Sequence, residues 1–179
     1  MFNSIHAQSD SVFASRIVTT VLAAAVVMTT MNANAQPANA GATNKKALVG
    51  GWIETVTFPP AIGRPPLKSL ATFHDDQTMV CSDQGAVTTV GPEPAVFTSC
   101  HGVWTHLEKR DFAYTSIELI SDLGGNLVGY LKVRGLYTIS ASGNEYTGTS
   151  LATIVDLDGN LLFSSEVTNS GQRIVVELP

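Results

Sequence analysis

Four residues are candidates for exchanging protons or holding a polar group in the interior of the fold: Glu54, His101, Tyr114 and Glu118. A carboxylate that is removed from water must be paired, hydrogen-bonded or protonated, and an imidazole titrates near neutral pH. Two acids and a phenol in one cavity would make a proton-transfer site, and the same groups would bind the polar part of a ligand. The faces from which these side chains project decide which role is open to them.

Glu54 stands two residues after Trp52, so the two side chains share one face of any strand. If Trp52 points into a core, Glu54 does so too. Its partner is then a cation of the chain (Arg173, Arg134 or Lys132) or a polar group on a ligand.

His101 belongs to the run Cys100-His101-Gly102-Val103-Trp104. Cys100, Gly102 and Trp104 share one face, so His101 projects from the other unless the strand bulges at Gly102. A glycine within a strand marks either a bulge or a close backbone approach. If Cys100 and Trp104 face inward, His101 therefore reaches an interior ligand only in the bulged case.

Tyr114 and Glu118 share a face with Phe112 and Ser116. The opposite face of the same segment is equally apolar, which leaves both directions open. Ligand binding by Tyr114 and Glu118 therefore requires that this face is the inner one.

No motif for catalysis, for a cofactor or for a metal is visible: G-x-S-x-G, H-E-x-x-H and a glycine-rich phosphate loop do not occur. The run Asp156-Leu157-Asp158-Gly159-Asn160 matches part of a calcium loop but lacks its later glutamate, so a hairpin turn is the favoured interpretation. His74-Asp75-Asp76 is likewise read as a solvated turn. We predict no catalytic residue, no cofactor and no metal site from these motifs.

Turn-forming combinations of Gly, Asn, Asp and Pro recur at nearly regular intervals, and the segments between them are rich in Val, Ile, Thr, Tyr and Phe. This pattern predicts strands at about 47–57, 66–74, 77–83, 96–106, 111–121, 127–139, 145–156 and 161–178, the last bent or bulged at Gly171. Short connections make neighbours antiparallel, and closure removes the two exposed edges. The expected fold is all-β: a single eight-stranded antiparallel up-and-down barrel, with a two-sheet sandwich as the alternative.

The first strand carries Gly50-Gly51-Trp52 and the last carries Arg173. In this G-x-W and late arginine the chain resembles the calycin group of lipocalin-like barrels, although the long final helix of true lipocalins is missing. The resemblance implies that Gly50, Trp52 and Arg173 meet at the closed end of the barrel. There the guanidinium would lie on the indole face, a cation–π contact with a structural role.

Cys81 and Cys100 are the two cysteines of the chain. In an oxidising compartment an even count favours a disulfide, here across a hairpin that turns near Gly91-Pro92. In the chain-entropy model such a closure stabilises the fold by about 3 kcal/mol. A metal-binding or nucleophilic thiol is the alternative, but it lacks a second ligand cluster or a paired histidine.

Residues 1–35 have the features of a secretory signal peptide: Arg16, an apolar run at 17–28 and the small-residue site Ala33-Asn34-Ala35. The run is short for a membrane anchor, which is the alternative and needs roughly 20 apolar residues. We therefore expect an exported protein, periplasmic or secreted, with no membrane span in its mature form. Residues 36–46 form a flexible lead-in, and residues 47–179 form the barrel domain.

The net charge of −5 is spread thinly, without the basic clusters that nucleic acids and anionic membranes require. Three functions remain. The first is a binding barrel for a small, mostly apolar (hydrophobic) ligand. The second is a small-barrel cyclase or isomerase resembling the allene oxide cyclase type, and the third is a structural or partner-binding domain with a filled core.

Overall fold

The protein is described by a computed structural model that covers residues 45–85, 87–90 and 93–178, with the backbone alone at 87–90. It contains ten strands and one short 3₁₀ helix. Their bounds are β1 Gly50–Thr57, η1 Pro60–Ile62, β2 Leu67–Phe73, β3 Thr78–Asp83, β4 Val87–Val90, β5 Glu93–Phe97, β6 Cys100–His106, β7 Asp111–Ser121, β8 Leu127–Ile139, β9 Glu145–Asp156 and β10 Leu161–Arg173. The expected signal peptide and most of the expected lead-in lie outside the described residues.

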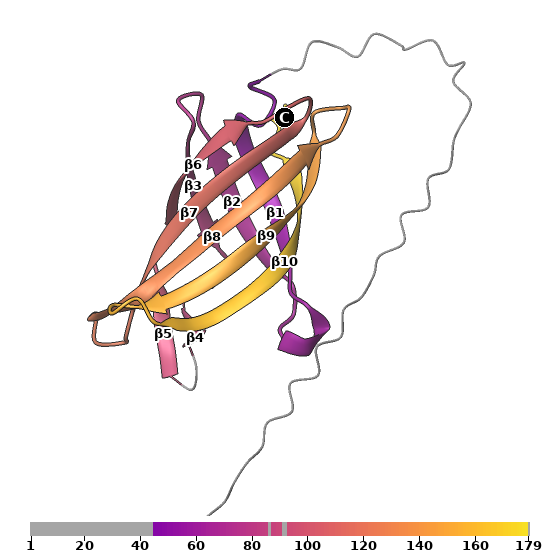
Figure 1. Cartoon of the computed structure of the whole chain (residues 1–179). Helices are drawn as coiled ribbons and strands as arrows, with labels where there is room; N and C mark the ends of the chain where they lie inside the picture. The colour runs from indigo at the N-terminus through magenta and orange to yellow at the C-terminus, as the bar shows by residue number, and fades with distance from the viewer. Residues whose placement is uncertain (1–44, 86, 91–92, 179) are drawn as a thin grey trace, which may run out of the picture. The chain divides into compact units, whose positions relative to one another are not determined.

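Eight of these strands close into an antiparallel barrel in the order β1-β2-β3-β6-β7-β8-β9-β10 (Figure 1). The ring closes where the first and last strands pair, with Trp52 opposite Arg173 and Thr57 opposite Thr168. This confirms the predicted all-β, eight-stranded barrel. A closed ring leaves no long exposed edge, which is why a chain of many strands favours it over an open sheet.

The strands β4 and β5 form an additional hairpin that the sequence reading did not foresee. The expected strand 96–106 is in fact divided between β5 and β6, and β5 pairs with the end of β7 only through Val96 and Phe97. In Figure 1 the hairpin and η1 both lie at the lower end of the barrel, next to the turns that follow β7 and β9. These segments therefore surround one mouth.

Two expectations about β10 are wrong. The strand ends at Arg173; the amide of Ile174 still donates to the Gly51 carbonyl oxygen at 2.8 Å, and the apolar side chains from Ile174 onward are exposed. The irregularity in its pairing lies between Leu161 and Phe163, whereas Gly171 stays in register opposite Tyr146. A side-chain carbon at Gly171 would lie 2.2 Å from the Tyr146 ring, so this glycine makes room for an aromatic side chain instead of a bulge.

The end of the barrel opposite the mouth is filled with large side chains. Trp52, Phe73, Phe112, Tyr137, Tyr146 and Ile139 are at most 2 % exposed, and they pack with Leu48, which precedes β1. Trp52 donates its indole hydrogen to the carbonyl oxygen of Leu48 at 2.9 Å, which fixes the segment before β1 to the core. We call this region the closed half of the barrel.

The predicted disulfide joins Cys81 of β3 to Cys100 of β6, and the two residues are directly opposite each other. The β3–β6 ladder runs from Thr78 only as far as this pair, and beyond it the chain leaves for the β4–β5 hairpin. The disulfide therefore ties the two strands together at the point where their backbone hydrogen bonds end.

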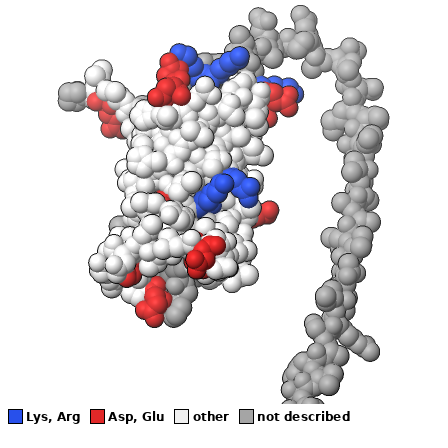
Figure 2. Space-filling model, turned by 60° about the vertical axis from the view of Figure 1, so that its left-hand side comes forward, with Lys and Arg blue, Asp and Glu red and all other residues white. Residues whose placement is uncertain are grey.

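Charged side chains on the face drawn in Figure 2 lie mainly towards the two ends of the barrel, and most of the wall between them carries none. Among the described residues the one ion pair joins Lys46 to Asp75 near the closed half. Within the same part of the chain, no helix has the length and apolar character needed to cross a membrane.

Candidate functional site

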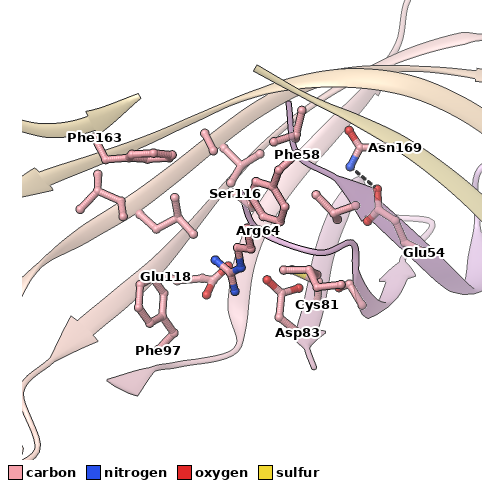
Figure 3. A pocket seen from close by; sticks show the side chains of 18 of the residues that line it. Glu54, Phe58, Arg64, Cys81, Asp83, Phe97, Ser116, Glu118, Phe163 and Asn169 are labelled. Carbon is pink, nitrogen blue, oxygen red and sulfur yellow. Dashed lines mark hydrogen bonds between the residues drawn. The ribbon is translucent and has the colours of Figure 1, made fainter. Parts of the chain in front are cut away.

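The half of the barrel next to the mouth contains a cavity of about 680 Å³ (Figure 3). Its walls are largely apolar and include Val56, Leu67, Met79, Leu131, Ile154 and Phe163. This volume lies within the range of small-molecule sites in proteins. We call this region the open half. In it, several of the strands that fill the closed half carry smaller inward side chains.

The floor of the cavity is formed by Glu54, which is 5 % exposed. The hydroxyl of Tyr137 donates to its Oε1 at 2.8 Å, and the amide of Asn169 donates to the same oxygen at 2.6 Å. Burial raises the pKa of Glu54 to about 7, although these two hydrogen bonds act in the opposite direction. The expected cationic partners are wrong: Lys132 and Arg134 are exposed, and Arg173 binds elsewhere.

A chain of hydrogen bonds continues from Glu54 to Tyr114. Ser150 donates its one hydroxyl hydrogen to Oδ1 of Asn169 at 2.7 Å, so the Tyr114 hydroxyl must be the donor to Ser150, also at 2.7 Å. Burial raises the pKa of Tyr114 and of Tyr137, which keeps both phenols protonated as donors. The orientation of every group in this network is thus fixed from Tyr114 to the carboxylate.

Three stacked tyrosines hold this network in place. Tyr114 stacks on Tyr137 with ring centroids 4.6 Å apart, and Tyr137 stacks on Tyr146 at 4.3 Å. Each ring lies over a glycine directly opposite it on the next strand, because Tyr114 pairs with Gly135, Tyr137 with Gly148 and Tyr146 with Gly171.

Side-chain carbons at these glycines would approach the tyrosine rings to 2.2–2.6 Å. The glycines therefore create the space in which the rings can stack. Without them the Tyr137 hydroxyl would not reach Glu54 in this geometry.

Glu118 projects into the cavity from β7, above the floor (Figure 3). It is 5 % exposed, and it has no hydrogen-bond or ion-pair partner among the described residues. Burial, and to a smaller extent the charge of Asp83, raises the pKa of Glu118 to about 8. In the free protein at neutral pH this carboxyl is therefore mostly protonated.

The mouth carries the opposite charges of Asp83 and Arg64. The guanidinium of Arg64 lies 4.8 Å from the ring centroid of Phe58. Partial desolvation beside the cavity raises the pKa of Asp83, and the Arg64 charge opposes this rise. Asp83 is exposed at the end of β3, so it stays in contact with water. Neither of the two glutamates inside the cavity forms an ion pair with a cation of the described residues.

The structure brings three of the four sequence-derived candidates together: Glu54, Tyr114 and Glu118 all line the cavity. His101 is exposed on the outer wall, and its strand pairs with β7 without a bulge. Gly102 instead serves close backbone approach, since a side-chain carbon there would lie 2.3 Å from the Thr115 carbonyl oxygen. His101 is thus not part of the cavity.

The expected contact between Trp52 and Arg173 is present in the closed half, where the guanidinium lies 4.2 Å from the indole centroid. Arg173 also donates to the carbonyl oxygens of Gly143, Val49 and Ala47. A side-chain carbon at Gly50 would lie 2.7 Å from the Arg173 guanidinium. These contacts are remote from the floor of the cavity.

Sequence reasoning missed Tyr137, Ser150 and Asn169. Asn169 shares its face with Arg173 on the same strand, so strand alternation could have indicated that both side chains point the same way. Its meeting with Glu54 depends on closure and register over 115 residues, which no local pattern encodes.

The run 156–160 forms the turn between β9 and β10. Oδ1 of Asp156 accepts hydrogen bonds from the backbone amides of Asp158 and Asn160 at 3.0 and 2.8 Å, so this carboxylate is occupied within the turn itself. Across the described ranges, no three His, Cys, Asp or Glu side chains are grouped as a metal site would require.

No family model, curated protein or solved structure matches the chain in sequence or fold comparisons.

Proposed function

We propose that the barrel binds a small, mostly apolar molecule in its open half. The observation that carries this proposal is the cavity of about 680 Å³, which is lined mainly by apolar side chains and floored by a fixed polar network. A few placed polar groups in an apolar enclosure are the usual composition of a small-molecule site. A filled core, the structural alternative, would leave no such space.

Blocking the cavity tests the proposal. Ala152 on β9 lines the cavity, so Ala152→Phe should fill part of it. Thr149 lies on the same strand with an exposed side chain, which makes Thr149→Phe the matched control. With the neutral apolar dye N-phenyl-1-naphthylamine, we expect saturable fluorescence enhancement in the wild type and in Thr149→Phe. Binding should weaken at least about ten-fold in Ala152→Phe. A wild type without saturable binding would contradict the proposal.

A proton-transfer enzyme, in the manner of a small-barrel cyclase or isomerase, is the second candidate. It is favoured by Glu54, whose pKa of about 7 suits a general acid or base, under an apolar cavity. Mass spectrometry of a small molecule that co-purifies from the native host separates the two functions. A binder returns it unchanged after incubation, whereas an enzyme converts it and Glu54→Gln stops the conversion.

The same proposal includes export and a calycin-like ancestry. The Cys81–Cys100 disulfide suits an oxidising compartment, and the Trp52–Arg173 contact matches the calycin arrangement at the closed end. Intact-mass measurement of the protein after export should give a mature chain that begins at Gln36. A chain that retains residues 1–35 would contradict the localisation.

A further inference from the structure

The cavity has an excess of negative groups. Three carboxyl side chains line it, those of Glu54, Asp83 and Glu118, against the one guanidinium of Arg64. The Arg64 charge acts on Asp83 at the rim, and Glu54 is engaged by Tyr137 and Asn169. At pH 8, where Glu54 is mostly ionised and Glu118 partly so, an anionic ligand would therefore meet net repulsion inside this enclosure, where water screens charge weakly.

Glu118 differs from the other two acids because nothing in the described part of the chain engages it. Only 5 % of its surface is exposed, and its carboxyl projects into the cavity (Figure 3). The carboxyl faces the cavity in largely apolar surroundings, where no protein group hydrogen-bonds it, so it is available to a ligand, a water or an ion. Glu118 thus marks where the polar part of a ligand goes.

The surroundings of Glu118 suit a cation with an apolar body. Phe97 pairs directly with Ile120, so its ring lies diagonally across from Glu118 on the inner face, and Leu131 is directly opposite on β8. A positive charge held by the carboxylate can also lie near the face of an aromatic ring. The apolar walls beyond would accept the rest of the molecule.

We propose, resting on the binding function argued above, that the ligand is an apolar molecule with one protonated amine, and that the carboxylate of Glu118 is its counter-charge. The charged or titratable groups that share the cavity with Glu118 are Glu54, Asp83, Arg64, Tyr114 and Tyr137, and its neighbours on β5 and β8 are apolar. Amine binding displaces the proton that Glu118 holds in the free protein.

Three ligands of one shape test the charge: 1-naphthylmethylamine, 1-naphthalenemethanol and 1-naphthoic acid. By calorimetry at pH 8, we expect the amine to bind at least about ten-fold more tightly than the alcohol, and the acid to bind most weakly. Because the pKa of Glu118 is about 8, amine affinity should rise more than about ten-fold from pH 6 to pH 8. Alcohol affinity should stay constant.

Glu118→Gln should lower the amine affinity to that of the alcohol and leave the alcohol unchanged. Glu166→Gln removes an exposed carboxylate and is the control. An amine that binds no better than the alcohol, or a preference that survives Glu118→Gln, overturns the proposal, provided that the near-ultraviolet circular dichroism of the variant is native. If none of the three compounds binds the folded wild type, the binding function itself is wrong.

Discussion

The two halves of the barrel are built from the same strands but differ in the volume of their inward side chains. The inward side chains become smaller from Trp52 to Val56 on β1, from Phe112 to Ser116 on β7 and from Tyr146 to Ala152 on β9. Nearer the mouth they are larger again, at Ile120 and Ile154. In the closed half the large members interlock and exclude solvent. In the open half the small members leave a cavity, so side-chain size along each strand, not strand number, decides where a ligand can enter.

The sharpest test of this difference is Trp52→Ala. The indole is fully buried, packs 4.9 Å from the Tyr146 ring and supports Arg173. Its removal should lower the free energy of unfolding by about 3–5 kcal/mol, measured by urea denaturation. Dye affinity of the remaining folded protein should be nearly unchanged. If Trp52→Ala loses dye affinity while its free energy of unfolding is unchanged, Trp52 belongs to the binding site and not to the structural core.

The disulfide should matter mainly to the open half. Cys81→Ala combined with Cys100→Ala should lower stability by about 3 kcal/mol in the chain-entropy model. It should also weaken dye binding, because β3 and β6 are no longer tied at the cavity wall. Urea denaturation and dye titration on the same samples measure both effects. Unchanged binding would mean that the wall keeps its shape without the covalent link.

The buried glutamates predict a stability that falls as pH rises. The pKa of Glu54 goes from 4.5 to about 7 in the folded protein, and that of Glu118 goes from 4.5 to about 8. Between these values the folded protein holds protons that the unfolded chain has lost, which stabilises the fold. This stabilisation is complete below pH 4.5 and is lost as pH rises through 7 and 8.

At about 1.4 kcal/mol per unit, the two shifts in full would correspond to about 8 kcal/mol. Because water in the cavity moderates both shifts, we expect a loss of about 2–3 kcal/mol between pH 5 and pH 9. Urea midpoints at each pH measure it. Glu118→Gln should flatten the upper part of the curve, and the exposed control Glu166→Gln should not. A pH-independent midpoint would show that both carboxyls are already ionised in the folded state.

Strand alternation predicted much of this arrangement. It placed Glu54 with Trp52, and it grouped Tyr114 with Glu118 on one face before that face was known to be the inner one. Cysteine count and expected compartment were enough for the disulfide. The first two features depend on residues close together in the sequence. The disulfide depends on the chain having two cysteines, so that one pairing is possible.

The rest depended on information that local patterns do not carry. The partners of Glu54 come from β8 and β10, 83 and 115 residues away, and only register brings them to one oxygen. The β4–β5 hairpin was missed because Pro94 indicates a loop. Pro94 is tolerated in β5 because this strand pairs with β7 only at Val96 and Phe97, and proline is accepted where a strand has a free edge.

The glycines under the tyrosines are a smaller difference between the halves. Gly171→Ala would place a carbon 2.2 Å from the Tyr146 ring, so stability should fall by about 1–3 kcal/mol through overpacking. Gly51→Ala is the control, because its new carbon would lie at an ordinary 3.5 Å from Ile174. Thermal unfolding of both variants measures the effect. Equal melting temperatures would mean that the stack can shift at no cost.

The smallest expected effect distinguishes a tyrosine that belongs to the polar network from one that only packs. The Tyr137 hydroxyl donates to Glu54. The buried Tyr146 hydroxyl makes no hydrogen bond of normal geometry within the described residues, although it lies close enough to lower the pKa of Glu54. Tyr137→Phe should therefore cost about 1–3 kcal/mol at pH 8, where Glu54 is mostly ionised, because it removes a bond to a charged group.

Tyr146→Phe should be neutral within about 0.5 kcal/mol or slightly stabilising, since it removes a polar atom whose burial is not compensated. Both variants keep the ring stack, so urea denaturation at pH 8 and pH 5 isolates the hydroxyls. The cost of Tyr137→Phe should shrink at pH 5, where Glu54 is protonated. A clear loss of stability in Tyr146→Phe would show that its hydroxyl does bind, and the polar network would then extend from the floor of the cavity into the closed half.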